Sequence, residues 1–127
     1  MTVNEPDVLA EVQDAFDRYE AALMANDLAS LDALFWPSPL TVRFGPGQNL
    51  YGIEAIKVFR TARVGGSPQR TLANTVITTF GRDLATANTE FQRQGAPKPG
   101  RQSQTWVRMD DGWRVVSAHI SFLGEGS

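Results

Sequence analysis

Arg43 lies at the centre of the short apolar segment LTVRF (residues 40–44), where a permanent positive charge needs a chemical explanation. Side chains alternate between the two faces of a strand, so Thr41 and Arg43 would share one face and the apolar side chains the other. Two interpretations are open. Arg43 either faces solvent, or it projects into an enclosed hollow, where its planar guanidinium can hold a carboxylate through two parallel hydrogen bonds.

Tyr19 and Glu90 are the candidates for moving protons. Tyr19 falls in the apolar stripe of an expected helix, where it either packs in the core or uses its hydroxyl to bind a carbonyl or pass a proton. A nearby Arg43 would assist proton transfer by stabilising the phenolate. Three interpretations of Glu90, at the centre of TANTEFQ, are open. It is either an exposed strand carboxylate, or a general base, or the counter-ion of Arg43.

Gln104 and His119 complete the set of candidate substrate-binding residues. Gln104, in RQSQTW, either hydrogen-bonds a ligand or faces water like its neighbour Gln102. His119 is the single histidine and lies in the last expected strand. It is either a hydrogen-bonded structural residue or a member of the site.

Several common chemistries are excluded by what the sequence lacks. It contains no cysteine, which rules out disulfides, thiol nucleophiles and thiolate metal sites. One histidine cannot build a histidine-rich metal site, and neither an H-E-x-x-H nor a G-x-S-x-G motif occurs. The segments GPG and GG match no glycine-rich phosphate loop. We therefore expect a protein that works without a metal or another cofactor.

The length and composition indicate one globular domain, which we place at residues 1–127. Hydrophobic residues make up 42% of the chain and charged residues 20%, as in ordinary globular proteins. No apolar run approaches the roughly 18 residues needed to span a membrane. The N-terminus lacks the pattern of a secretory signal, so we expect a cytoplasmic protein.

The net charge of −2 is unevenly distributed along the chain. Residues 1–39 hold eight acidic residues against one base, Arg18, whereas the remaining chain holds eleven bases and six acids. Its arginines are scattered rather than gathered in a basic run. This pattern argues against a nucleic-acid partner and suits a small anion.

Three helices are predicted in the N-terminal half of the chain. The first covers residues 4–27, with Asn4 as its N-cap, and has an inward stripe at spacings of three and four residues, formed by Val8, Val12, Phe16, Tyr19 and Leu23. Asp27 is expected to cap a second helix, LASLDALFW (28–36). A third helix, GIEAIKVFRTAR (52–63), precedes a glycine pair at 65–66 that would end it.

Strands are predicted elsewhere. LTVRF precedes the third helix, and four strand-like runs follow it: RTLANTVITTF (70–80), LATANTEFQRQ (84–94), RQSQTWVRM (101–109) and WRVVSAHISFL (113–123). Their short links predict antiparallel hairpins. The order of elements indicates an α+β fold, in which three helices pack on one face of a curved antiparallel sheet. Such a sheet closes into a cone whose mouth is a natural ligand site.

The outer face of this open sheet would expose valine, isoleucine and aromatic side chains to water. We therefore expect a second copy of the chain to cover it, giving a homodimer. No internal repeat or interdomain linker is found.

The order of these elements resembles the SnoaL-like branch of the NTF2-like superfamily. More narrowly, FDRYEAAL, LFW, TVRFG, NLYG, RTLANTVITTFGRDLATANTEFQR, GRQSQTWVR and GWRVVSAHIS resemble the AtzH-like proteins, a group that includes HpxZ-like proteins of oxalurate catabolism. The likeness covers nearly the whole chain. It implies an NTF2-like cone, a role beside an amidase in the breakdown of ureido or s-triazine-derived acids, and a pocket pair of tyrosine and arginine, which correspond to Tyr19 and Arg43.

The resemblance favours the hollow-facing interpretation of Arg43. The leading hypothesis is a small, cofactor-free hydrolase of the amidohydrolase type acting on a carboxylated urea-like or amide compound. Arg43 would anchor the carboxylate, Tyr19 would polarise a carbonyl or relay a proton, and Glu90 or His119 would assist a water. One alternative is a non-catalytic, ligand-binding partner of a larger amidase. Another is a ketosteroid-isomerase-like proton-transfer enzyme with Glu90 as its base.

Overall fold

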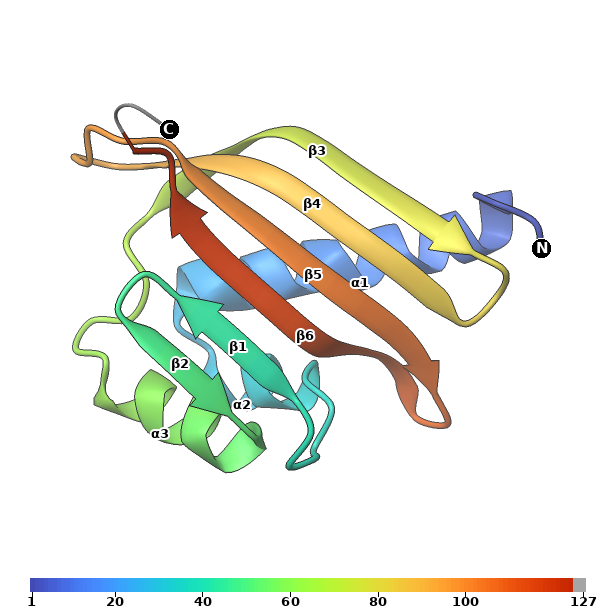
Figure 1. Ribbon diagram of the computed structural model, residues 1–127, viewed down its shortest axis with the longest axis horizontal. Helices are drawn as coiled ribbons and strands as arrows, with labels where there is room; N and C mark the ends of the chain where they lie inside the picture. The colour runs from blue at the N-terminus through green and yellow to red at the C-terminus, as the bar shows by residue number, and fades with distance from the viewer. Residues whose placement is uncertain (125–127) are drawn as a thin grey trace.

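Six strands form one curved sheet in the computed structural model, which describes residues 1–124 (Figure 1). They follow the order β2-β1-β6-β5-β4-β3 across the sheet. Their bounds are β1 Val42–Gly45, β2 Gln48–Tyr51, β3 Arg70–Phe80, β4 Leu84–Arg93, β5 Gly100–Met109 and β6 Gly112–Phe122. The helices α1 Pro6–Ala25, α2 Leu28–Ala33 and α3 Ile53–Ala62 lie on one side of the sheet, so the predicted α+β layout is confirmed. None of these helices, within residues 1–124, is long and apolar enough to cross a membrane.

The predicted meander of four strands is confirmed, because β3, β4, β5 and β6 are antiparallel neighbours in chain order. The sheet departs from a purely antiparallel one at β1, which pairs in parallel with β6 and places Arg43 opposite Ala118. Parallel pairing is possible here because the two strands are far apart in sequence and no hairpin has to join them. The pairing brings Arg43 beside the last strand.

The sequence analysis did not predict β2. The strand LTVRF was expected to be followed directly by the third helix, but Gly45 pairs with Gln48 and the chain turns back through Pro46 and Gly47. The result is a hairpin of β1 and β2. Strand β2 has only four residues and begins with Gln48 and Asn49. Because asparagine is disfavoured in strands, this short segment shows no recognisable strand pattern.

Two irregularities bend the sheet. The register of β3 with β4 shifts between Ala73 and Val76, where Asn74 adopts a left-handed conformation with a φ of 52°. The register of β5 with β6 shifts between Thr105 and Trp106. Bulges of this kind bend a strand and increase its twist, which curves the sheet around the helices.

Helix α1 carries the predicted stripe but not the predicted cap. All members of the stripe are buried: Val8, Val12, Phe16, Tyr19 and Leu23. The helix begins at Pro6, and Asn4 lies before it with a φ of 58°. The Asn4 N–H donates to the Thr79 carbonyl (3.0 Å), and Asn4 Oδ1 accepts from the Thr79 N–H (2.9 Å). Asn4 therefore joins the N-terminal segment to β3 instead of capping a helix.

Asp27 caps α2 as predicted. Its Oδ1 accepts from the Ser30 N–H (3.2 Å), and its Oδ2 accepts from the Ser30 hydroxyl (2.6 Å). The helix ends at Ala33, earlier than predicted, because the next residues pair with the sheet. The Trp36 N–H donates to the carbonyl of Val115 in β6 (3.0 Å).

The hydrophobic core lies between α1 and the concave face of the sheet. Its largest fully buried side chains include Phe16, Phe35 and Trp106. The ring of Tyr19 packs among them, with its centroid 6.1 Å from that of Phe35 and 6.5 Å from that of Trp106. Beyond Tyr19, towards the C-terminal end of α1, polar side chains line the concave face.

Replacing Asp27 by alanine should lower the free energy of unfolding by about 1 kcal/mol, because the Ser30 N–H loses its capping acceptor. Chemical denaturation followed by circular dichroism measures the difference. Asp110→Ala is the control, since Asp110 is exposed in the turn between β5 and β6. Equal effects of the two substitutions would contradict the capping role.

Candidate functional site

A polar hollow lies where the concave face of the sheet meets the C-terminal half of α1 and the segment that follows α3. Four strands reach it from one end of the sheet, where β3 and β5 begin and β4 and β6 end. We call it the arginine hollow. It is lined by Tyr19, Leu23, Arg43, Arg63, Ser67, Arg70, Arg93, Gln102 and Ile120.

The arginine hollow has a narrow inner part and a wider mouth. The inner part encloses about 10 Å³, close to the space that one water occupies. The mouth is a cavity of about 240 Å³ that shares Arg43, Arg63 and Arg93 with the inner part and also includes Gln48 and Phe59. A ligand of this site must therefore be small.

Arg43 faces the hollow, as the second of the two sequence interpretations required. Thr41 and Arg43 are both buried, and the Arg43 guanidinium lies 4.9 Å from the centre of the Phe59 ring. Its Nη1 is buried without a hydrogen-bond partner within residues 1–124. Burial lowers the pKa of the Arg43 guanidinium to about 10, an effect that Tyr19 partly offsets and Arg63 increases. Among residues 1–124, no carboxylate forms an ion pair with this buried cation.

Arg63 and Arg93, which are half-buried, add two further guanidiniums. The Nε atoms of both are buried and lack a partner in the described part of the chain. Arg63 stacks on Phe59 (5.3 Å) and Arg93 on Phe122 (4.9 Å). Burial lowers the pKa of each guanidinium, and the positive charge of neighbouring arginines lowers it further. Ring faces support these cations while leaving N–H groups free for an anion.

The segment that carries Arg63 is fixed to α1 by close packing at Gly66. Gly66 has a φ of 73°, and a Cβ at this position would lie 2.6 Å from the side-chain amide of Asn26. Asn26 is itself the left-handed residue that ends α1. The glycine pair predicted to end α3 therefore has a second role, because only glycine allows this approach.

Arg70 differs from the other three arginines because it has a carboxylate partner. Its Nε donates to Glu20 Oε2 (3.0 Å) and its Nη2 to Glu20 Oε1 (2.6 Å). The Arg70 side chain is 2% exposed and that of Glu20 is 17% exposed. The same Nη2 also donates to Gln102 Oε1 (3.1 Å), while Gln102 Nε2 is buried without a partner.

Tyr19 shares the hollow with Arg43, so the structure brings together the two residues implied by the family resemblance. Tyr19 is 4% exposed, and its hydroxyl makes no hydrogen bond to any other residue within 1–124. Its ring is held by the aromatic core. A ligand in the hollow would therefore meet a free phenol beside a free guanidinium.

Glu90 and His119 do not line the hollow, so the expectation that they assist there is not met. Both are exposed on the outer face of the sheet, because strand alternation sends their sequence neighbours inward. Glu90 accepts a hydrogen bond from Asn74 Nδ2 (2.8 Å). The His119 ring packs edge-on against Phe44, with the two centroids 5.8 Å apart.

Gln102, not Gln104, is the glutamine that lines the hollow. Both are 2% exposed on the inner face of β5, since residues two apart share a face. Gln104 Oε1 accepts from Trp106 Nε1 (3.1 Å), deeper in the core, and its Nε2 has no partner in the described chain. The burial of Trp106 on the same face is the signal that could have placed Gln102 inward.

The sequence analysis therefore missed three of the residues that give the hollow its chemistry, Arg63, Arg93 and Gln102. Its signal for Arg63 and Arg93 was the scatter of arginines along the C-terminal two thirds of the chain. Together with Arg43 they present four buried nitrogens that lack partners. An arrangement of unpaired donors suits an anion with several acceptor atoms.

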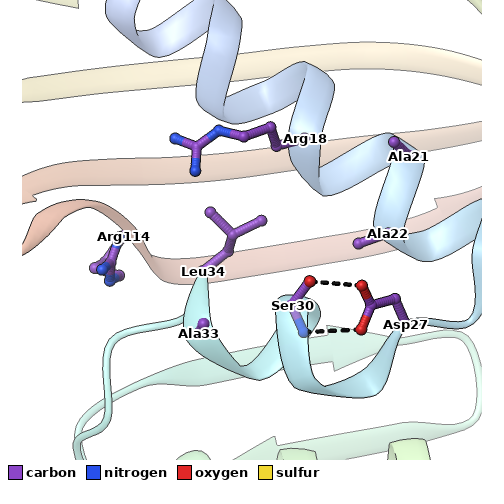
Figure 2. A pocket seen from close by; sticks show the side chains of 8 residues that line it. All are labelled: Arg18, Ala21, Ala22, Asp27, Ser30, Ala33, Leu34 and Arg114. Atoms are coloured by element: carbon purple, nitrogen blue, oxygen red, sulfur yellow. Dashed lines mark hydrogen bonds between the residues drawn. The ribbon is translucent and has the colours of Figure 1, made fainter.

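A second depression, of about 380 Å³, lies between α1 and α2 (Figure 2). Its polar groups already have partners. Asp27 and Ser30 bond to each other, Arg18 pairs with Asp14 (3.0 Å), and Arg114 donates to backbone carbonyls. Without unpaired donors or acceptors converging on it, this depression offers less to a ligand than the arginine hollow does.

Comparisons with known proteins agree with this fold. The AtzH-like family model matches residues 1–126. A protein of unknown function from the DUF3225 family of Pectobacterium atrosepticum is 58% identical, with a TM-score of 0.94 over 96% of this chain and 95% of that chain. A cystatin-like fold protein from Burkholderia xenovorans is 48% identical, with a TM-score of 0.93 and 98% of each chain covered.

A more distant structure is an NTF2-like superfamily protein from Salmonella enterica serovar Typhimurium. It is 26% identical, with a TM-score of 0.78 over 95% of this chain and 94% of that chain. Among curated proteins, none matches the chain. The NTF2-like fold expected from the sequence is confirmed by these structures.

Arg43→Met should raise the free energy of unfolding by about 1–3 kcal/mol, because it removes a buried charge that has no partner. Burial places the folded-state pKa of Arg43 at about 10, below its unfolded value. The destabilisation is therefore fully present at neutral pH and is relieved only as the pH rises above that value. Denaturant titration at pH 7 measures the change.

The control for this measurement is Arg101→Met, because Arg101 is exposed on the outer face of β5. Its effect should stay within about 0.5 kcal/mol. A clear loss of stability in Arg43→Met would mean that the Arg43 charge is balanced in the folded protein.

Proposed function

Because this chain belongs to the AtzH-like family of NTF2-like proteins, we propose that its arginine hollow binds a small carboxylated urea-like or amide compound and that the protein hydrolyses it without a cofactor. We propose that such a compound belongs to oxalurate or s-triazine-type nitrogen catabolism, as the family resemblance implies. The proposed enzyme is a small cytoplasmic hydrolase of catabolism that binds one carboxylic acid molecule in its hollow.

The observation that carries the proposal is the convergence of unpaired donors. Arg43 Nη1, Arg63 Nε, Arg93 Nε and Gln102 Nε2 are all buried without partners around one hollow. Each unmade hydrogen bond costs free energy in the empty site. A carboxylate would supply the missing acceptors and the missing negative charge at once, which supports anion binding as the basic function.

The size of the hollow favours a small carboxylate. Its inner part holds about 10 Å³ and its mouth about 240 Å³, which suits a ligand of few atoms with one end inside. The rings of Phe59 and Phe122 stack against three of the guanidiniums. This stacking turns the N–H edges of the arginines, rather than their faces, towards a ligand.

In the proposed reaction, water adds to the ligand carbonyl and the C–N bond breaks. The Tyr19 hydroxyl relays a proton: it accepts one from the water as it gives its own to the leaving nitrogen. The products are an acid and an amine or ammonia. The arginines hold the carboxylate of the ligand, and their positive charge also stabilises the negative charge that develops on the nearby carbonyl oxygen. Catalysis then depends on positioning and electrostatics more than on a strong base.

A second candidate is a ligand-binding partner of a larger amidase. Among the described residues that line the hollow and its mouth, none is a carboxylate or a histidine. This composition supports binding without turnover, because Tyr19 is left as the single group able to accept a proton from water.

An isomerase of the ketosteroid-isomerase type is not supported. Such an enzyme needs a carboxylate in an apolar pocket to abstract a proton. Glu90, the residue expected to serve, is exposed and bonded to Asn74 on the other face of the sheet. Glu20, the acid that contacts Arg70 of the hollow, is held by Arg70 in an ion pair.

Binding can be tested with N-carbamoylglycine, oxalurate, malonate and inorganic phosphate by isothermal titration calorimetry and thermal shift. At a hundredfold its dissociation constant, a true ligand should add about 2.7 kcal/mol of stability. Arg43→Ala should abolish the gain, while Arg101→Ala on the outer face should preserve it. A preference for phosphate over every carboxylate, or no effect of Arg43→Ala, would contradict the proposal.

Turnover can be tested by incubating the purified protein with N-carbamoylglycine or oxalurate and measuring ammonia, with no amidase added. Tyr19→Phe should lower kcat by about 10²–10⁴-fold and leave the dissociation constant within about threefold, because it keeps the ring and removes only the hydroxyl. Binding without turnover in the wild-type protein would favour the accessory role.

A further inference from the structure

We propose that Gln102 is a specificity-determining residue that donates a hydrogen bond to a neutral carbonyl oxygen of the ligand, and that the Glu20–Arg70 pair is the positioning device that aims it. The inference rests on the proposed function, since it assumes that the arginine hollow binds a small carboxylate. It adds the group that distinguishes a urea-like or amide compound from a plain carboxylic acid.

The orientation of the Gln102 amide is fixed by Arg70. A glutamine amide has one end that accepts hydrogen bonds and one that donates them, whereas a guanidinium only donates. Arg70 Nη2 lies 3.1 Å from Gln102 Oε1, so the oxygen is the end that faces Arg70. If the Gln102 amide were flipped, its NH2 group would face the Arg70 N–H, and no hydrogen bond could form between the two donors. Gln102 Nε2 must therefore point away from Arg70, and it is buried there without a partner.

Arg70 is itself immobilised. Two hydrogen bonds join it to Glu20, and its guanidinium lies 4.6 Å from the centre of the Phe91 ring. Gly100 permits this arrangement, because a Cβ there would collide with the Phe91 ring. The chain Glu20–Arg70–Gln102 thus links α1, β3 and β5 and leaves Gln102 little freedom to turn.

Glu20 also determines which cations of the hollow are available to a ligand. It neutralises Arg70, so the cations available to a ligand are Arg43, Arg63 and Arg93, none of which has a carboxylate partner among the described residues. Gln102 is a neutral donor beside them. Charged donors bind a carboxylate more strongly than a neutral amide does, so the carboxylate of a ligand belongs to the arginines.

The remaining donor, Gln102 Nε2, suits a neutral acceptor. An amide or urea carbonyl offers lone pairs without a charge that would compete for the arginines. A hydrocarbon in the same place would leave Nε2 buried and unpaired, and a site built to hydrogen-bond a ligand rejects an analogue that lacks the partner atom. An ammonium there would meet both a donor and the surrounding positive charge.

The matched pair of probes is N-carbamoylglycine and 4-methylpentanoate, which have the same number of heavy atoms and one carboxylate each, but only the first has a carbonyl to accept from Gln102. Titration calorimetry on the full chain should show tighter binding of N-carbamoylglycine. Gln102→Leu should weaken that compound about tenfold and leave 4-methylpentanoate within about twofold, removing the preference.

Glu20→Gln tests the positioning role of the ion pair without replacing a residue that lines the hollow. It keeps the size of the side chain but frees Arg70, so the preference for the carbonyl compound should shrink while 4-methylpentanoate binds equally or more tightly. Gln104→Leu is the matched control on the same strand and should retain the preference. Circular dichroism and denaturant unfolding check that each variant is folded.

The outcomes separate the two proposals. Equal weakening of both probes by Gln102→Leu, or no preference in the wild-type protein, overturns the role of Gln102 while the binding of carboxylates by the hollow stands. An unchanged preference in Glu20→Gln overturns the positioning role of the ion pair. Failure of both probes to bind the wild-type protein contradicts the proposed function itself.

Discussion

The buried positive charge of Arg43, which no carboxylate in the described part of the chain balances, is the constraint on which the rest of the site depends. A charge in this state opposes folding, and the free energy gained by burying the hydrophobic core between α1 and the sheet offsets that cost. The ring of Phe59 lies 4.9 Å from the Arg43 guanidinium and 5.3 Å from that of Arg63, so one aromatic side chain supports two cations. What the site still lacks is negative charge, which a bound anion can supply.

The uneven charge of the sequence explains why three arginines remain free. The acidic residues of the N-terminal third are used to join elements to one another rather than to serve the hollow. Arginines from later in the chain pair with them: Arg60 with Asp32, Arg70 with Glu20, and Arg82 with Glu5 and Asp7. These pairs hold α3 against α2 and β3 against α1. Arg43, Arg63 and Arg93 make no ion pair with this acidic set among the described residues. The uneven charge of the sequence therefore separates the arginines that join structural elements from the arginines that face a ligand.

Much of the fold could be predicted because its elements are local. Runs of β-branched and aromatic residues defined the meander, and strand alternation placed Arg43 on the face of buried Thr41. The choice between the two faces was harder for Glu90, because polar residues occur on both faces of its strand, and alternation does not say which face is inside. The grouping of Arg63, Arg93 and Gln102 with Arg43 could not be predicted, since it depends on the parallel pairing of β1 with β6, which no local pattern encodes.

The double hydrogen bond between Asn4 and Thr79 has a consequence for how the molecule meets other chains. Strand β3 is the last strand of the sheet on its side, and an uncovered outer strand can recruit a strand from another molecule. The N-terminal segment bridges to Phe80 through Val3, and the bulge at Asn74 interrupts the strand further along. The N-terminal segment thus covers one end of the β3 edge and opposes edge-to-edge aggregation there. The arginine hollow lies at the opposite end of β3 and stays open to small molecules.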